Sequence, residues 1–112
     1  MKRKILVVGG SGFIGTNILR MIDKKKNFIS ATIYKSRKHK KIKNVKYFKG
    51  NLKNINFCRK ITKSVDVVIM CAAVSSGAFV MQNNPSFHVD DNIIMNLNIL
   101  KASAENKIKK FI

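Results

Sequence analysis

Acidic residues are scarce in this sequence. Five Asp and Glu stand against 23 Lys and Arg, which gives a net charge of +18 over 112 residues. None of the five lies between Lys24 and Val65, although 15 of the basic residues do. Such charge is typical of proteins that bind nucleic acid or other polyanions, but a solvated lysine-rich surface explains it equally well. Because no interleaved aromatic residues or helix-turn-helix pattern accompany the lysines, nucleic-acid binding is the minor hypothesis.

Long apolar runs and cysteines are also few. The longest apolar run, residues 65–74, is broken by Asp66 and falls short of the roughly 20 residues that a membrane-spanning helix needs. The basic start is followed by aliphatic residues that stop at glycines rather than at a cleavage site, so we expect no signal peptide. Cys58 and Cys71 have neither metal-ligand nor disulfide spacing. We therefore expect a reduced, cytoplasmic protein with no metal site and no membrane partner.

The alternation of apolar segments predicts the fold class. The length of the sequence and its hydrophobic content of 46% fit one domain over residues 1–112. We expect strands over residues 5–8, 28–34, 45–48, 65–71 and 109–112, and helices over 13–23, over 53–62 and from Pro85 onward. The fourth strand is almost wholly aliphatic, which predicts burial on both faces, and residues 72–84 are expected to form a loop. The order predicts an α/β, doubly wound parallel sheet, a Rossmann fold that is incomplete and ends in the fifth strand.

The last predicted helix begins at a proline. Asn84 is expected to cap it, with Pro85 at its first position. Its apolar residues recur at spacings of four, four, three and four and predict one apolar stripe: Val89, Ile93, Leu97, Leu100 and Ala104.

A glycine-rich turn links the first strand to the first helix. Gly10, Gly12 and Gly15 fit the common dinucleotide-binding spacing. Gly9, Gly12 and Gly15 fit the wider spacing found in short-chain dehydrogenases. Glycines there permit the tight turn, the approach of a pyrophosphate and close packing of the helix on the strand. Apolar residues on helical spacing follow: Phe13, Ile14, Ile18, Met21 and Ile22. The pattern predicts a dinucleotide site; the alternative is a strand-turn-helix unit without a ligand.

The end of the second predicted strand bears on the choice of cofactor. A site for NAD usually has an acidic residue about 20 positions past the glycines, which accepts hydrogen bonds from the ribose 2′-OH. This sequence offers Lys35 and Arg37 there instead. A guanidinium holds a phosphate through two parallel hydrogen bonds, so we expect NADP rather than NAD. The alternative is that both residues belong only to the solvated basic stretch.

Several segments resemble the extended short-chain dehydrogenase/reductases, the NAD(P)-dependent epimerase/dehydratase family that acts on nucleotide sugars. Residues 8–15 are similar to the family's opening, and residues 50–52 resemble its Gly-Asp-Leu, with Asn51 in place of the acid that contacts adenine. Residues 71–73 resemble the strand end that lines the cofactor, and Asn92 with residues 98–102 resembles the family's long helix. The segments 72–77 and 83–85 resemble the GDP-L-fucose synthase branch most.

The resemblance implies which residues contact the dinucleotide. Together with the two basic residues at the end of the second strand, the expected cofactor-binding residues are Gly9, Gly10, Ser11, Gly12, Phe13, Ile14, Gly15, Lys35, Arg37, Asn51, Leu52, Ala72 and Ala73. Since the carboxyl ends of parallel strands meet at one edge, we expect the glycine turn, the end of the second strand and the loop after the fourth to lie together.

The resemblance covers the whole chain but only about the first third of a family member. It implies that the catalytic serine and the Tyr-x-x-x-Lys pair lie beyond Ile112, so we expect no catalytic residue and no activity in this chain alone. Tyr34 and Lys38 have the right spacing, and Ser75 with Ser76 resembles a serine pair. Neither is expected to act, because spacing does not place a group within reach of the reacting atoms.

These observations lead to three hypotheses. The first is the cofactor-binding portion of an NADP-dependent nucleotide-sugar epimerase, dehydratase or reductase, whose full-length parent could form a homodimer. The second is a free-standing Rossmann module that senses NADP without catalysis. The third is a basic polyanion or nucleic-acid binder on the same fold.

Overall fold

The computed structural model describes residues 2–35, 40–74 and 78–112. In chain order its elements are β1 (Arg3–Val8), α1 (Phe13–Met21), β2 (Asn27–Ile33), β3 (Val45–Lys49), α2 (Ile55–Thr62), β4 (Val67–Met70), α3 (Ala78–Asn83), α4 (Phe87–Glu105) and β5 (Lys110–Phe111).

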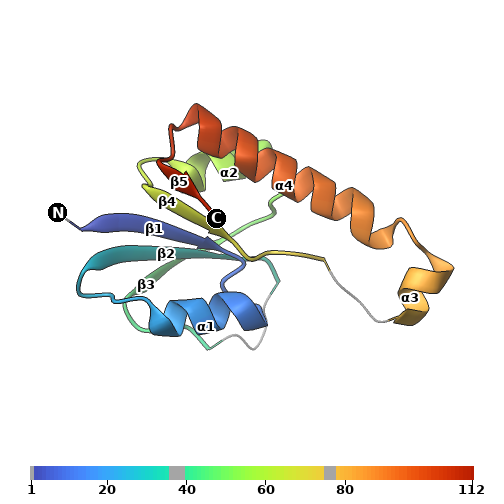
Figure 1. The fold of residues 1–112 in the computed structure, drawn as a ribbon, viewed down its shortest axis with the longest axis horizontal. Coiled ribbons are helices and arrows are strands. Elements are labelled where there is room, and N and C mark those ends of the chain that lie inside the picture. Colours follow the sequence, from blue (N-terminus) through green and yellow to red (C-terminus); the bar gives the residue numbers. More distant parts are fainter. Residues whose placement is uncertain (1, 36–39, 75–77) are drawn as a thin grey trace.

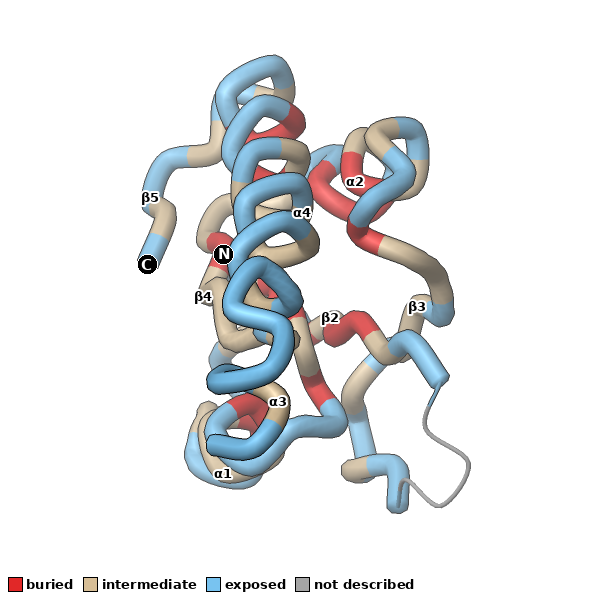
Figure 2. The backbone as a smooth tube through the Cα atoms, turned by 90° about the vertical axis from the view of Figure 1, so that its right-hand side faces the viewer, coloured by how far each residue is buried: buried red, intermediate tan, exposed pale blue. Residues whose placement is uncertain are grey.

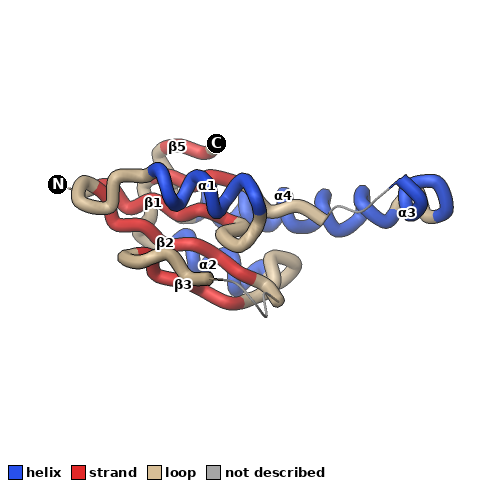
Figure 3. The backbone as a smooth tube through the Cα atoms, turned by 90° about the horizontal axis from the view of Figure 1, so that it is seen from below, coloured by secondary structure: helices blue, strands red, loops and turns tan. Residues whose placement is uncertain are grey.

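The strands form one parallel sheet in the order β3-β2-β1-β4-β5 (Figure 1). The chain winds outward from β1 to β3 and then returns to the other side of β1 for β4. Helix α1 covers one face, and helices α2 and α4 cover the other, as Figures 1 and 3 show. The predicted doubly wound Rossmann-type sheet is therefore confirmed, and β1 and β4 flank the point where the strand order reverses.

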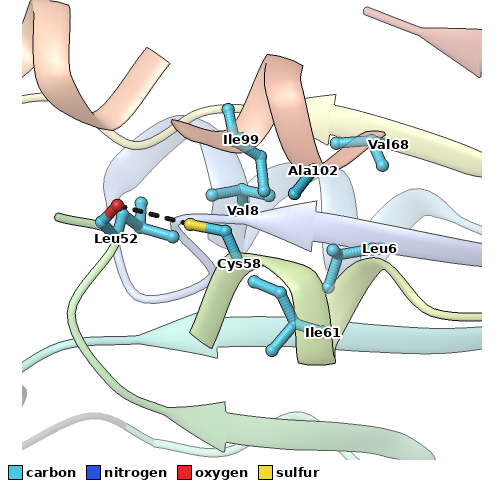
Figure 4. Close-up of a cluster of buried hydrophobic side chains, with 8 residues drawn as sticks. All are labelled: Leu6, Val8, Leu52, Cys58, Ile61, Val68, Ile99 and Ala102. Atoms are coloured by element: carbon cyan, nitrogen blue, oxygen red, sulfur yellow. Dashed lines mark hydrogen bonds between the residues drawn. The ribbon is translucent and has the colours of Figure 1, made fainter. Parts of the chain in front are cut away.

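Alternation along β1 separates two cores. Leu6 and Val8 point toward α2 and α4, where they pack with Ile61 and Ile99 in the cluster drawn in Figure 4. Val7 points the other way and packs with Leu19 of α1. All six side chains are buried, so β1 is the shared centre of both layers and fixes the position of the turn that follows it.

Some predicted boundaries differ from the structure. Helix α1 ends at Met21 because Ile22 is already extended, with ψ 133°. Helix α2 starts at Ile55 because the side chain of Asn54 caps it by accepting from two backbone N–H groups. Strand β4 packs against both cores as predicted but is not fully buried: Val68 is buried, whereas Val67, Ile69 and Met70 are half-buried. Strand β5 is in register with Val67 and Val68 of β4, and the backbone N–H of Met70 also donates to Ile112 O at 2.7 Å.

The segment between β4 and α4 is not the continuous loop that the sequence predicts. Residues 78–83 form α3, and the backbone N–H of Asn84 donates to Val80 O at 2.8 Å at its end. The backbone N–H of Phe87 then donates to Asn84 O, so Asn84 and Pro85 form a turn rather than a helix start. Helix α4 begins at Phe87 with Ser86 as its N-cap residue, which corrects the predicted cap.

The apolar stripe predicted along the last helix faces solvent. Its members Val89, Ile93, Leu97 and Leu100 are 48–62% exposed, whereas Ile99 and Ala102 on another side of α4 are fully buried. The first half of α4 extends past the sheet together with α3 (Figure 1), and the outer side of α4 is exposed in Figure 2. Helix α1 likewise leaves Phe13, Ile14 and Met21 exposed. Periodicity thus predicted α1 and α4 but not which side of each is buried, since of the apolar residues expected along α1 only Ile18 and Ile22 pack against the core.

Candidate functional site

The glycine turn after β1 is tied to the end of β2. Gly9 has φ +92°, and a Cβ atom there would lie 2.6 Å from the backbone nitrogen of Ala72. The N–H of Gly9 donates to Thr32 Oγ1 at 2.9 Å, and the N–H of Gly10 donates to Thr32 O at 2.7 Å. A side chain at Gly9 would therefore both strain the backbone and collide with the chain after β4.

Two later glycines of the turn serve different purposes. Gly15 is buried, and a Cβ on it would overlap the carbonyl group of Gly9. Gly12 is exposed, with φ −75° and ψ 172°, and the nearest atom to a Cβ placed there is Gly9 O at 3.8 Å. The fold needs Gly15 for close packing, but nothing around Gly12 requires glycine. The missing side chain at Gly12 leaves open space beside the turn.

Helix α1 begins at this open space. No described side chain caps its N-terminus by a hydrogen bond, and its first turn, which the structure describes in full, holds no acidic residue. The first backbone N–H groups of a helix have no partner within the helix, and the helix dipole favours an anion there. This end of α1 can therefore accept a phosphate group.

A pocket of about 310 Å³ lies at the carboxyl edge of the sheet. Of the residues expected to bind cofactor, those that line it are Gly9, Ser11, Gly12, Asn51, Leu52, Ala72 and Ala73. Gly10, Phe13, Ile14, Gly15 and Lys35 do not line it. Arg37 lies outside the described residues, as do Lys38, Ser75 and Ser76. The pocket thus brings together the glycine turn, the segment after β3 and the segment after β4, as the strand order requires.

Other residues of the pocket were missed by sequence reasoning. Thr32 and Tyr34 line it from the end of β2, and Met95 lines it from α4. Lys53 and Asp91 also line it, with Lys53 Nζ 3.3 Å from Asp91 Oδ1. These two residues are 38 positions apart. Nothing local in the sequence indicates their pairing, because only the packing of α2 and α4 brings them together.

Asn51 and Asn92 shape the pocket through their amide groups. Asn51 Oδ1 accepts a hydrogen bond from the backbone N–H of Lys53 at 2.9 Å. The NH₂ group of Asn51 is the part of its amide that can donate to a ligand. Asn92 Oδ1 accepts from the backbone N–H of Val74 at 2.8 Å, and its Nδ2 donates to Val74 O at 2.9 Å. Asn92 therefore fixes the chain where it leaves β4, next to Ala72 and Ala73.

The two thiols differ in their access to the pocket. Cys71 lines the pocket and is half-buried, whereas Cys58 is fully buried in the core and donates to Leu52 O at 3.3 Å (Figure 4). Burial raises the pKa of the Cys58 thiol to about 11 and also raises the pKa of Cys71. Both are thus protonated at neutral pH and react slowly, since the thiolate is the nucleophile.

Thiol labelling should report on occupancy of the pocket. At pH 8 we expect iodoacetamide to alkylate Cys71 slowly and Cys58 not at all in the folded chain, because Cys58 is inaccessible. NADPH at ten times its dissociation constant should slow alkylation of Cys71 about tenfold, since only the free form reacts. Mass spectrometry of the alkylated peptides measures both rates, and Cys71→Ser is the control. An unchanged Cys71 rate with bound NADPH would contradict this placement of the cofactor.

Two features are absent from the part of the chain that the structure describes. No described helix combines the length and apolar character needed to cross a membrane. Residues 2–35, 40–74 and 78–112 contain no cluster of three or more His, Cys, Asp or Glu residues able to hold a metal ion.

A parallel sheet that reverses its strand order beside β1, with a glycine turn at that point, is the architecture of a Rossmann-type domain. The chain belongs to the NAD dependent epimerase/dehydratase family, whose model matches residues 5–112.

Individual proteins show the same relationship. The chain is 30% identical over 112 residues to GDP-mannose 3,5-epimerase 1 of Oryza sativa subsp. indica, covering 98% of this chain and 30% of the relative. Among solved structures it is similar to Pen from Bacillus thuringiensis, with a TM-score of 0.83, 25% identity and coverage of 98% and 37%. The fold also matches the Bordetella bronchiseptica enzyme WbmH in complex with NAD⁺, with a TM-score of 0.77, 18% identity and coverage of 99% and 38%. The chain thus spans about a third of these proteins.

Proposed function

We propose that this chain is the cofactor-binding portion of an NAD(P)-dependent nucleotide-sugar epimerase, dehydratase or reductase, and that it prefers NADP. The observation that carries the proposal is the open side of Gly12 beside the uncapped N-terminus of α1. That arrangement lets the backbone approach a pyrophosphate and leaves N–H groups free to bind it. The cofactor would supply hydride chemistry, and this chain's residues would bind and orient it.

The preference for NADP rests on the end of β2. Pocket-lining Tyr34 is followed by Lys35, which is exposed, and Lys35 Nζ lies 5.0 Å from the centre of the Tyr34 ring. The acidic residue that lines the pocket, Asp91, is already paired with Lys53. A ribose 2′-phosphate at this strand end would meet a lysine rather than a carboxylate, which favours the phosphorylated cofactor.

Calorimetric titration of the chain with NADPH and NADH tests the proposal. In moderate salt, which screens non-specific attraction, we expect NADPH to bind about tenfold more tightly, as one charge-assisted hydrogen bond implies. Lys35→Ala should remove most of that difference and leave NADH affinity unchanged. Lys41→Ala is a matched control, because Lys41 is also exposed and lies over a tyrosine ring, Tyr47, at 5.9 Å. Equal losses for both cofactors would contradict the role of Lys35.

The substrate and assembly of the whole protein extend the same proposal. The name of the rice relative includes GDP-mannose, which supports a GDP-linked sugar as the substrate of the full-length protein. The exposed apolar side chains of α4 support a homodimer of that protein. Residues beyond those of this chain would supply the catalytic serine and the tyrosine-lysine pair.

A further inference from the structure

The amino ends of the strands lie at the opposite end of the sheet from the glycine turn (Figure 1, left). A second hollow lies at these amino ends. Its volume is about 850 Å³, which lies within the range of ligand-binding cavities. It is lined by the starts of β1, β2 and β3, the turn before β2, and the segment that links α2 to β4. None of the described residues that are expected to bind the dinucleotide belongs to it.

The hollow gathers positive charge from segments far apart in the sequence. Its lining includes seven lysines and no acidic residue: Lys2, Lys4, Lys24, Lys25, Lys46, Lys60 and Lys63. Among the described residues, the four ion pairs join acids to other basic residues: Lys26, Lys53, Arg59 and Lys109. Lys4 also interacts electrostatically with the carboxylate of Asp66. The lining as a whole still carries a strong positive charge, and a polyanion would relieve the repulsion between its lysines.

Two aromatic rings lie among these lysines. Phe28 of β2 is on the same face of the sheet as Thr32, whose partner on β3 is Phe48, so both rings share that face. Both line the hollow; Phe28 is 57% exposed, whereas Phe48 is half-buried and also packs against the core beneath α2 and α4. Lys2 Nζ lies 5.0 Å from the centre of the Phe28 ring, and Lys46 Nζ lies 5.1 Å from that of Phe48. The aromatic interleaving that is missing along the sequence is thus present in space.

We propose that this hollow binds single-stranded nucleic acid. Lysines around a groove neutralise backbone phosphates, and exposed rings provide faces on which unpaired bases stack. Lys2 and Lys46 already lie next to the rings, so a stacked base would bring its phosphates to them. A duplex hides the faces of its bases, and a chain of phosphates without bases leaves Phe28 and Phe48 unused. The combination of both features therefore favours a single strand.

Fluorescence anisotropy with a labelled 12-nucleotide oligothymidine tests the proposal on the 112-residue chain. The double variant Lys25→Glu/Lys63→Glu changes two exposed residues of the hollow, and Lys101→Glu/Lys110→Glu makes the same charge change on α4 and β5. The first pair should weaken binding about tenfold more than the second. Loss of two phosphate contacts should also lower the slope of log affinity against log salt by about 1.4. Phe28→Leu should weaken binding about fivefold through lost stacking.

Several controls separate this site from the dinucleotide pocket. Saturating NADPH should not displace the oligonucleotide, and the Lys25→Glu/Lys63→Glu variant should bind NADPH as the unchanged chain does. Circular dichroism checks that every variant is folded. Equal losses from the two double variants would overturn the proposal in favour of general charge attraction. Equal affinity for duplex DNA or for polyphosphate would overturn it too, because the rings would then contribute nothing.

Discussion

Gly12→Val should lower dinucleotide affinity by about 100-fold or more while the chain stays folded. A valine at this position would place its side chain in the space beside the uncapped end of α1. The pyrophosphate would then lose hydrogen bonds to backbone N–H groups, and two such bonds to a charged group account for a loss of this size. The backbone at Gly12 suits any residue, with φ −75° and ψ 172°, and a Cβ there meets nothing closer than 3.8 Å. We therefore expect the free energy of unfolding to change by less than about 1 kcal/mol.

Gly15→Ala is the opposite case and serves as the control. The Cβ atom of the alanine would overlap the carbonyl group of Gly9. Neither this backbone segment nor the backbone of α1 can move aside easily. We expect a loss of about 3 kcal/mol in the free energy of unfolding, measured by urea denaturation. Calorimetric titration with NADPH and urea denaturation of both variants separate the two roles. A folded Gly12→Val variant with unchanged affinity would show that the turn is only structural.

The doubly wound parallel sheet and the edge at which the pocket lies could be predicted because they depend on local patterns. An aliphatic strand followed by glycines, and strands that alternate with helices, leave few topologies open. Because the strands are parallel, the carboxyl ends of β1, β2 and β4 then meet at one edge of the sheet, whatever the conformation of the loops. Gly9 follows β1 directly, and Gly12 and Asn51 come within four residues of a strand end, so sequence reasoning could place them at the pocket.

Other features depend on which helix face meets the sheet and could not be predicted. The ion pair of Lys53 with Asp91 and the gathering of Phe28 and Phe48 among lysines both join residues from different segments. The spacing of Leu97 and Leu100 predicts an apolar stripe, but spacing alone does not say whether the sheet reaches far enough to cover it. In this structure α4 uses Ile99 and a neighbouring alanine and serine for packing and leaves the stripe exposed.

Ile99→Ala should destabilise the chain strongly, whereas Leu97→Ala on the same helix should not. Ile99 is fully buried among Val8, Val68 and the other side chains of the cluster in Figure 4, and truncating such a residue leaves a cavity that costs about 2–5 kcal/mol. Leu97 is 62% exposed, and alanine is the better helix former, so its replacement should change the free energy of unfolding by less than about 0.5 kcal/mol. Urea denaturation at two protein concentrations measures both. A large, concentration-dependent loss for Leu97→Ala would show that another copy of the chain covers the stripe, and equal losses at every concentration would contradict the orientation of α4.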